Sequence, residues 1–80
     1  MPLRKAWEDL SRTTVGKAPE RYGVYEIGDA DGDVVEVGAG VLTDELKEAL
    51  AYGAGEQVRW ETTPSLDRAE ELASEYRDRL

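Results

Sequence analysis

Apolar residues recur at a helical spacing in three parts of the chain. The first group lies within residues 1–12 at positions i, i+4 and i+7 and comprises Leu3, Trp7 and Leu10. This spacing predicts a short amphipathic helix that packs one stripe onto the domain. Two further helical stripes occupy residues 42–50 and 66–80. Each of the three is therefore expected to bury one face.

Strand patterns fill most of the remaining chain. Two β-favouring runs, residues 22–27 and 34–37, are separated by a turn rich in Gly and Asp, which predicts a β-hairpin. In residues 57–62 apolar and polar side chains alternate, as in a strand with one exposed face. Residues 13–21 contain Gly and Pro without a clear period and are expected to form a connector.

Polar residues mark the boundaries of the predicted helices. Thr43 is expected to cap the second helix, whose first turn carries Asp44 and Glu45. The run Thr63-Pro64-Ser65 marks the start of the third helix. The element order is then αββαβα, an α+β fold with a three-stranded antiparallel sheet flanked by helices. We expect one domain over residues 1–80, with the N-terminal helix at 1–12 and the core at 22–80.

Composition removes several classes of function. Eighty residues suffice for one domain, and 40% of them are hydrophobic, so a core is expected. The absence of cysteine and histidine excludes disulfides, thiolate or imidazole zinc sites, cysteine nucleophiles and histidine bases. No run approaches the ~20 apolar residues of a membrane span. We therefore expect an intracellular, cytoplasmic monomer without membrane contact.

The chain is strongly acidic, with a net charge of -8 and three lysines. Such a charge opposes binding to nucleic acid or anionic membranes. The composition is also typical of haloarchaeal cytoplasmic proteins, and we expect that origin. At about 1 M salt the screening length falls to about 3 Å, so repulsion of a polyanion weakens there.

Two loops contain residues that could bind ions. Asp29, Asp31 and Asp33 alternate as in calcium loops, but Val34 stands where an EF-hand needs glycine, and strands flank the loop. The preferred interpretation is a hairpin turn without metal. The run Gly38-Ala39-Gly40 precedes a predicted helix, as phosphate-binding loops do. Because acids follow at the helix start, a simple strand-to-helix turn is preferred.

Acids also gather on the third predicted helix: Glu70, Glu71, Glu75 and Asp78. General acid–base catalysis needs groups that converge on a pocket. Most of these side chains lie off the apolar stripe, so we interpret them as a solvated face.

Two triplets on the hairpin carry a family resemblance. Gly23-Val24-Tyr25 on the first strand and Glu36-Val37-Gly38 on the second, followed by helix, strand and helix, resemble the GIY-YIG nuclease domain. The likeness extends over nearly the whole chain. It implies a three-stranded antiparallel sheet with the triplets on its first two strands. The helix at 42–50 and the stretch Ala69-Glu70-Glu71-Leu72 stand where the family's core helices stand.

The family's catalytic residues map onto this chain with one match. Tyr25 corresponds to the tyrosine of the first triplet, and Glu36 stands at the tyrosine of the second. Glu45 stands at the phosphate-binding arginine, and Val41 at the asparagine that precedes that helix. Ala73 stands at the glutamate that binds the divalent metal. The resemblance thus implies the scaffold without the active site.

These replacements favour a non-catalytic role. Cleavage of a phosphodiester needs a cation near the phosphate and an oriented base. Glu45 reverses the charge of the expected arginine, and Ala73 removes the metal ligand. We therefore expect a non-catalytic GIY-YIG-like module that serves protein interaction or another binding role and uses no cofactor or metal. Tyr25 and Glu36 would be vestiges of the active site.

Two alternatives remain open. The first is a divergent nuclease with relocated groups: Tyr25, Glu36 and Glu75, with Lys47 or Arg59 as the phosphate contact. The second is nucleic-acid binding without catalysis, because aromatic rings stack on bases. Its surface would comprise Tyr25, Arg59 and Trp60. The net charge counts against both.

Overall fold

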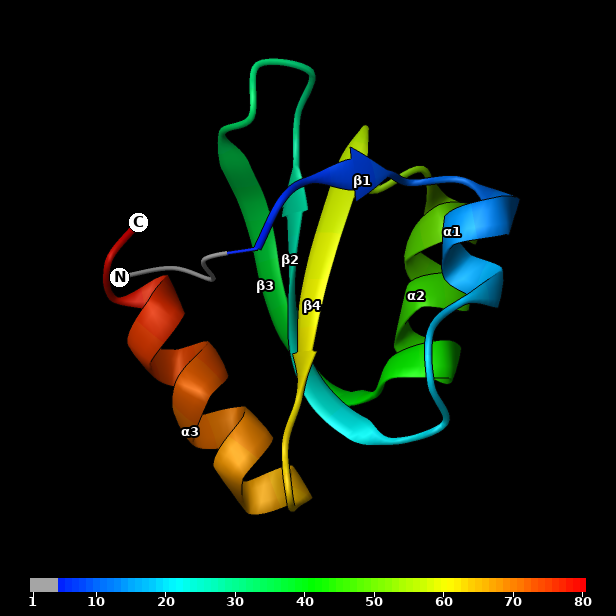
Figure 1. Ribbon diagram of the computed structural model, residues 1–80. Helices are drawn as coiled ribbons and strands as arrows, with labels where there is room; N and C mark the ends of the chain where they lie inside the picture. Colours follow the sequence, from blue (N-terminus) through cyan, green and yellow to red (C-terminus); the bar gives the residue numbers. More distant parts are fainter. Residues whose placement is uncertain (1–4) are drawn as a thin grey trace.

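A computed structural model describes residues 5–80, in which an antiparallel sheet lies between helices (Figure 1). In chain order the elements are β1 (Glu8–Asp9), α1 (Arg12–Gly16), β2 (Tyr22–Gly28), β3 (Val34–Val41), α2 (Leu42–Tyr52), β4 (Gln57–Thr62) and α3 (Leu66–Arg77). Helix α3 covers one face of the sheet, and α1 and α2 cover the other. The α+β class with helices flanking an antiparallel sheet is confirmed.

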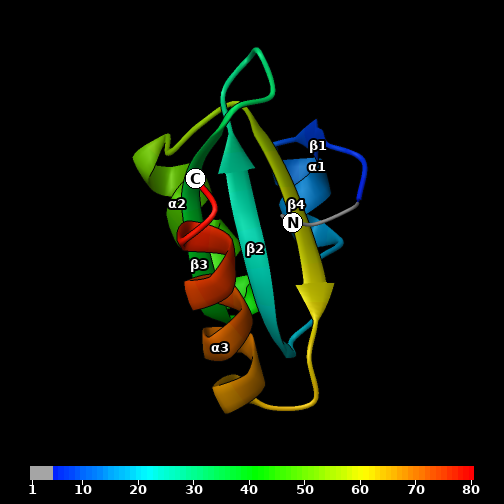
Figure 2. The ribbon, with the colours of Figure 1, turned by 90° about the vertical axis from the view of Figure 1, so that its left-hand side faces the viewer.

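The sheet has four strands in the order β1-β4-β2-β3, so the prediction of three strands is wrong. The additional strand is short: Glu8 pairs with Val58 and Asp9 with Gln57. The hairpin β2–β3 and the strand β4 lie where the sequence pattern predicted them, except that β3 continues to Val41, beyond the predicted range 34–37. Figure 2 shows α3 in front of the sheet and α2 behind it, with β2 between β3 and β4.

The predicted N-terminal helix is also wrong within the described residues, and Leu3 lies outside them. Trp7 lies in an irregular segment directly before β1, and its ring covers Gly28. A Cβ atom on Gly28 would lie 2.7 Å from Trp7 Cη2. Helix α1 begins at Arg12, five residues after Trp7, and the side chain of its N-cap Ser11 accepts a hydrogen bond from the N–H of Thr14 at 3.3 Å. Part of the predicted connector at 13–21 is therefore helical.

Side chains alternate across β2, and each face of the sheet has its own core. On the α1 and α2 face, Tyr25 and Ile27 pack with residues such as Leu46. On the α3 face, Val24 packs with a second cluster that includes Ala73. Tyr25 therefore lies in the core beneath α1 and α2, and its neighbour Val24 lies in the core beneath α3.

The start of α2 differs from the prediction. Helix α2 follows β3 directly, and its N-cap residue is Val41, without a side-chain cap. Thr43 instead donates a hydrogen bond from Oγ1 to Ala18 O at 3.1 Å. Gly38-Ala39-Gly40 belongs to β3, so it is neither a turn nor a phosphate loop. At α3 the prediction is confirmed, since the Ser65 side chain accepts from the N–H of Arg68 at 3.1 Å.

Candidate functional site

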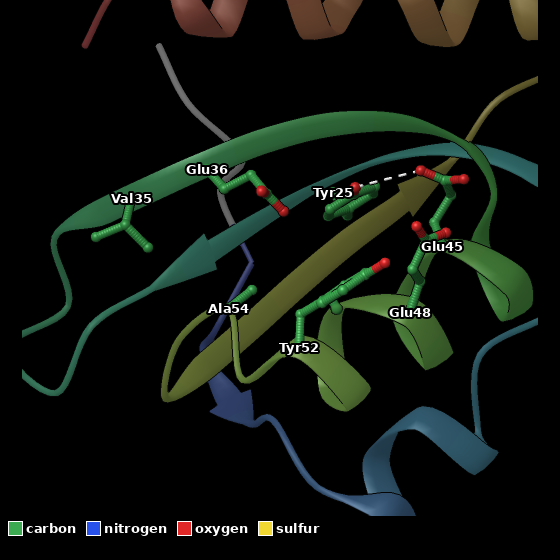
Figure 3. Close-up of a pocket in the computed structure, with 8 residues that line it drawn as sticks. Tyr25, Val35, Glu36, Glu45, Glu48, Tyr52 and Ala54 are labelled. Carbon is green, nitrogen blue, oxygen red and sulfur yellow. Dashed lines mark hydrogen bonds between the residues drawn. The ribbon is translucent and has the colours of Figure 1, made fainter.

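A cavity of about 420 Å³ lies between β3 and α2, beside Tyr25 of β2 (Figure 3). Its polar lining comes from three carboxylates and two phenols: Glu36, Glu45, Glu48, Tyr25 and Tyr52. The remaining lining is small or apolar: Val35, Ala49 and Ala54. Two of the polar residues, Tyr25 and Glu36, were predicted as site residues from the sequence, and the structure brings them together.

Tyr25 forms the buried wall of the cavity. It is 6% exposed, and its Oη donates a hydrogen bond to Glu45 Oε1 at 3.3 Å, drawn as a dashed line in Figure 3. Its ring lies against Gly38 of β3, where a Cβ atom would be 2.7 Å from Tyr25 Cε1. Burial, followed by the negative charges of Glu45 and Glu36, raises the pKa of Tyr25. The phenol is therefore a neutral hydrogen-bond donor and a poor base.

The helix α2 contributes its carboxylates from one face. Glu45, Glu48, Ala49 and Tyr52 are spaced i, i+3, i+4 and i+7 along it, a spacing that places them on one side of a helix. The sequence reasoning missed Glu48 and Tyr52 as site residues. Their spacing from Glu45 could have indicated them, because residues at i+3 and i+7 lie on the same side of a helix as residue i.

The site is electrostatically negative. Glu36 reaches it from β3, and Glu45 and Glu48 reach it from α2 (Figure 3). Among the described residues that line the cavity, none is basic. Three carboxylates around one concave surface concentrate a negative potential. The arrangement attracts a cation and repels a phosphate.

The predicted binding surface of Tyr25, Arg59 and Trp60 is divided in the structure: Trp60 pairs with Tyr25 across β2 and β4 and lies on the same face, whereas Arg59 lies on the opposite face. Arg59 lies on the α3 face of the sheet, where its Nε is 2.7 Å from Oε1 of the buried Glu26. The Trp7 ring centroid lies 4.0 Å from its guanidinium carbon. Trp60 packs on the opposite face, against the core that contains Tyr25. Adjacent strand residues point to opposite faces, which explains the separation.

The groups assigned to a divergent nuclease do not all converge on the cavity. Tyr25 and Glu36 line it, but Glu75 lies on α3, on the other side of the sheet. Lys47 lines a different depression with Arg12. Arg59 is held by the buried carboxylate described above. The side chains proposed to bind phosphate are thus absent from the lining that holds Tyr25.

The aspartates of the β2–β3 turn serve the turn itself. One carboxylate oxygen from each of Asp29, Asp31 and Asp33 lies within 4.8 Å of the others. Asp29 Oδ1 accepts hydrogen bonds from the N–H groups of Asp31 and Asp33 at 2.9 and 3.0 Å. This is how an aspartate holds its own backbone in a turn. The hairpin-turn interpretation therefore explains the spacing of the acids.

Comparison with protein families gives a match over nearly the whole chain. A family model described as "Domain of unknown function (DUF7508)" matches residues 1–79. No curated protein and no solved structure matches the chain. Across residues 5–80, no helix has the combination of length and apolar character needed to cross a membrane.

Proposed function

Because the chain belongs to the DUF7508 family, whose description assigns no activity, we propose from its geometry that it is a non-catalytic binding module for a basic segment of a partner protein. The observation that carries the proposal is the lining of one cavity by Glu36, Glu45 and Glu48 together with two tyrosines. The binding module thus recognises a positive charge.

A lysine or arginine side chain has an apolar stem and a charged end, and each of these parts matches a part of the cavity lining. Its methylene groups would contact the apolar wall at Val35 and Ala49, as the stems of long basic side chains do. Its charged end would reach the carboxylates, where charge-assisted hydrogen bonds are stronger than neutral ones. The ring of Tyr52, which is 79% exposed, offers a face for a cation–π contact.

In this proposal the domain is GIY-YIG-like in scaffold and altered in its site. The positions that the resemblance assigns to the two tyrosines and the arginine are Tyr25, Glu36 and Glu45, and all three side chains line the cavity. Glutamate at two of them supports recognition of a cation in place of a phosphodiester. Phosphoryl chemistry would need positive charge at this point, so the nuclease alternative is the weaker one.

The binding test uses a fluorescein-labelled oligolysine peptide and fluorescence anisotropy. Wild type is expected to bind, and the double variant E36Q/E45Q is expected to bind at least ten-fold more weakly. The control E70Q/E75Q removes the same charge from exposed positions on α3 and should change the affinity less than two-fold. Equal losses in the two double variants would show that net charge alone attracts the peptide, and would refute the cavity as the site.

The nuclease alternative has its own test. Incubation with branched and single-stranded DNA and with RNA, in Mg²⁺ or Mn²⁺ at low and at high salt, is expected to leave the substrates intact. Cleavage that disappears in Y25F, while the fold is retained, would overturn the non-catalytic proposal. The phenylalanine variant keeps the ring over Gly38 and removes only the hydroxyl group.

A further inference from the structure

Within residues 5–80, the outer edge of β3 has backbone groups that no other strand of the sheet uses. The carbonyls at both ends of β2, Tyr22 and Gly28, accept hydrogen bonds from the chain flanking β4, at 2.9 Å each. Even-numbered residues of β2 therefore direct their backbone groups to β4. Their partners on β3, which are Val37, Ala39 and Val41, must direct their backbone groups away from the sheet.

One of these outward groups is occupied by a side chain. Arg77, in the last turn of α3, donates from Nε and Nη2 to Val37 O at 3.1 and 2.9 Å. Its guanidinium thus occupies a carbonyl that an additional strand would otherwise use. Natural sheets commonly protect their edges with charged side chains in this way, because an open edge pairs with other chains.

The edge and the acidic cavity adjoin each other. Val35 and Glu36 belong to β3 and also line the cavity. A strand added beyond β3 would lie about 4.8 Å from it, with alternate side chains on the α2 face of the sheet. Side chains on that face would be next to Glu36 and the cavity mouth. The same partner segment could therefore use both features.

We propose that the basic partner segment binds as an extended strand on the outer edge of β3, with alternate lysine or arginine side chains directed to the cavity. The inference rests on the proposed function and adds the way in which the segment is held. Backbone hydrogen bonds to Val37 and Ala39 supply affinity, and the carboxylates select for positive charge, as in other cases of strand addition. The partner's strand displaces Arg77 from Val37 O.

Charge decides between this occupant and a second copy of the chain. Two copies joined through β3 would bring together two chains that each carry a net charge of -8. A symmetric antiparallel pair would also place both cavities on the same side of the joined sheet, each with Glu36 near the junction. Like charges across an interface oppose association. A basic segment has the complementary charge.

The probe is an acetylated and amidated eight-residue peptide that alternates lysine and valine. The matched control peptide has the same sequence and charge, but the backbone nitrogens that would face β3 carry N-methyl groups. These methyl groups remove the N–H donors that strand addition needs. The unmodified peptide is expected to bind at least ten-fold more tightly than the control. Its binding should also slow amide hydrogen exchange at Val37 and Ala39, measured by NMR, while exchange at Gly38, already bonded to β2, changes little.

The outcomes separate this inference from the proposed function. Equal binding of the two peptides, with loss of both in E36Q/E45Q, would overturn strand addition and leave the acidic cavity as a binding site. No binding of either peptide would overturn both. A dimer of the free protein in sedimentation that shows protected Val37 and Ala39 amides would identify a second copy as the occupant and overturn the basic segment.

Arg77 provides a second variant for the same test. R77K retains the positive charge but loses the two-pronged contact with Val37 O, so it should bind the alternating peptide a few-fold more tightly than wild type. Its affinity for the N-methylated peptide should not change. A role of Arg77 confined to electrostatics predicts equal affinities in wild type and R77K, and that result would count against displacement.

Discussion

Replacement of Arg59 by methionine would leave the carboxylate of Glu26 without its charged partner. Glu26 is 0% exposed, and its Oε1 lies 2.7 Å from Arg59 Nε. Within residues 5–80, its other oxygen, Oε2, has no hydrogen-bond partner. The substitution R59M therefore exposes the full cost of a buried charge, while it preserves most of the side-chain volume.

The loss of stability expected for R59M is large relative to the free energy of unfolding of the whole domain. Removal of one member of a buried ion pair costs about 3–5 kcal/mol, and the contact with Trp7 adds roughly 0.5–2 kcal/mol. A domain of 80 residues has a total stability of roughly 4–12 kcal/mol. R59M should therefore lower the free energy of unfolding by at least 3 kcal/mol on this order-of-magnitude scale, and could unfold much of the population.

Urea denaturation followed by circular dichroism measures the loss, with two controls. K17M breaks the exposed ion pair between Lys17 Nζ and Glu8 Oε1 at 2.9 Å, and should cost about 0–1 kcal/mol. The double variant E26L/R59M removes both charges, and should recover most of the stability because apolar replacements of a buried pair are often neutral. The loss in R59M should persist at about 1 M salt, where exposed pairs are screened.

A loss in R59M no larger than that in K17M would refute the reasoning. It would mean that water reaches Glu26 and that the carboxylate is not desolvated. A double variant as unstable as R59M would also refute it, because the cost would then come from lost packing with Trp7 and not from the unpaired charge.

Three smaller predictions concern the stability of the fold around Gly38, Ser65 and Tyr25. G38A should cost about 1–3 kcal/mol in thermal denaturation, because its Cβ would overlap the Tyr25 ring, whereas G16A meets nothing within 4 Å and should be near neutral. S65A should cost about 1 kcal/mol through loss of the α3 N-cap, and the exposed S74A should not. The pKa of Tyr25 is raised in the folded protein, so this group contributes stability that is fully present below the unfolded pKa of about 10 and is lost as the pH rises further. In Y25F the free energy of unfolding should therefore fall less at alkaline pH than in wild type, as measured by urea denaturation at a series of pH values.

The sequence predicted the elements after residue 21 because their signals are local. The hairpin has its turn in Asp29 and its neighbours, α3 has its cap in Ser65, and α2 ends at Gly53, whose φ of 64° suits glycine. Each signal lies within a few residues of the boundary that it marks. The hydrophobic period then sets which side of each helix is buried.

The N-terminal segment could not be predicted in this way. The spacing of Trp7 and Leu10 fits a helix, but tertiary contacts override this weak preference. Trp7 instead covers Gly28, and Glu8 pairs with β4. Both partners are distant in sequence, so no local pattern indicates them. The fourth strand was missed for the same reason.

For the site, the family resemblance and the alternation along the strands carried different information. The resemblance assigned Tyr25 and Glu36 to the two strands of the hairpin, and the structure brings both side chains to one cavity. Arg59 and Trp60 are neighbours in β4, so period-two alternation already placed them on opposite faces. The ion pair of Arg59 with Glu26 follows from their cross-strand register, which sequence alone did not provide.

The acidic character of the chain and the acidic cavity have different consequences for binding. Exposed carboxylates such as Glu70 and Glu75 attract any cation weakly, and salt removes most of that attraction. Around the cavity, Glu36 and Glu48 are also exposed, but the half-buried Glu45 is held by the buried hydroxyl group of Tyr25, and the proposed backbone hydrogen bonds at the β3 edge join uncharged groups that salt does not screen. Binding of a basic segment that survives at about 1 M salt must therefore come from the cavity and the β3 edge, and not from the net charge.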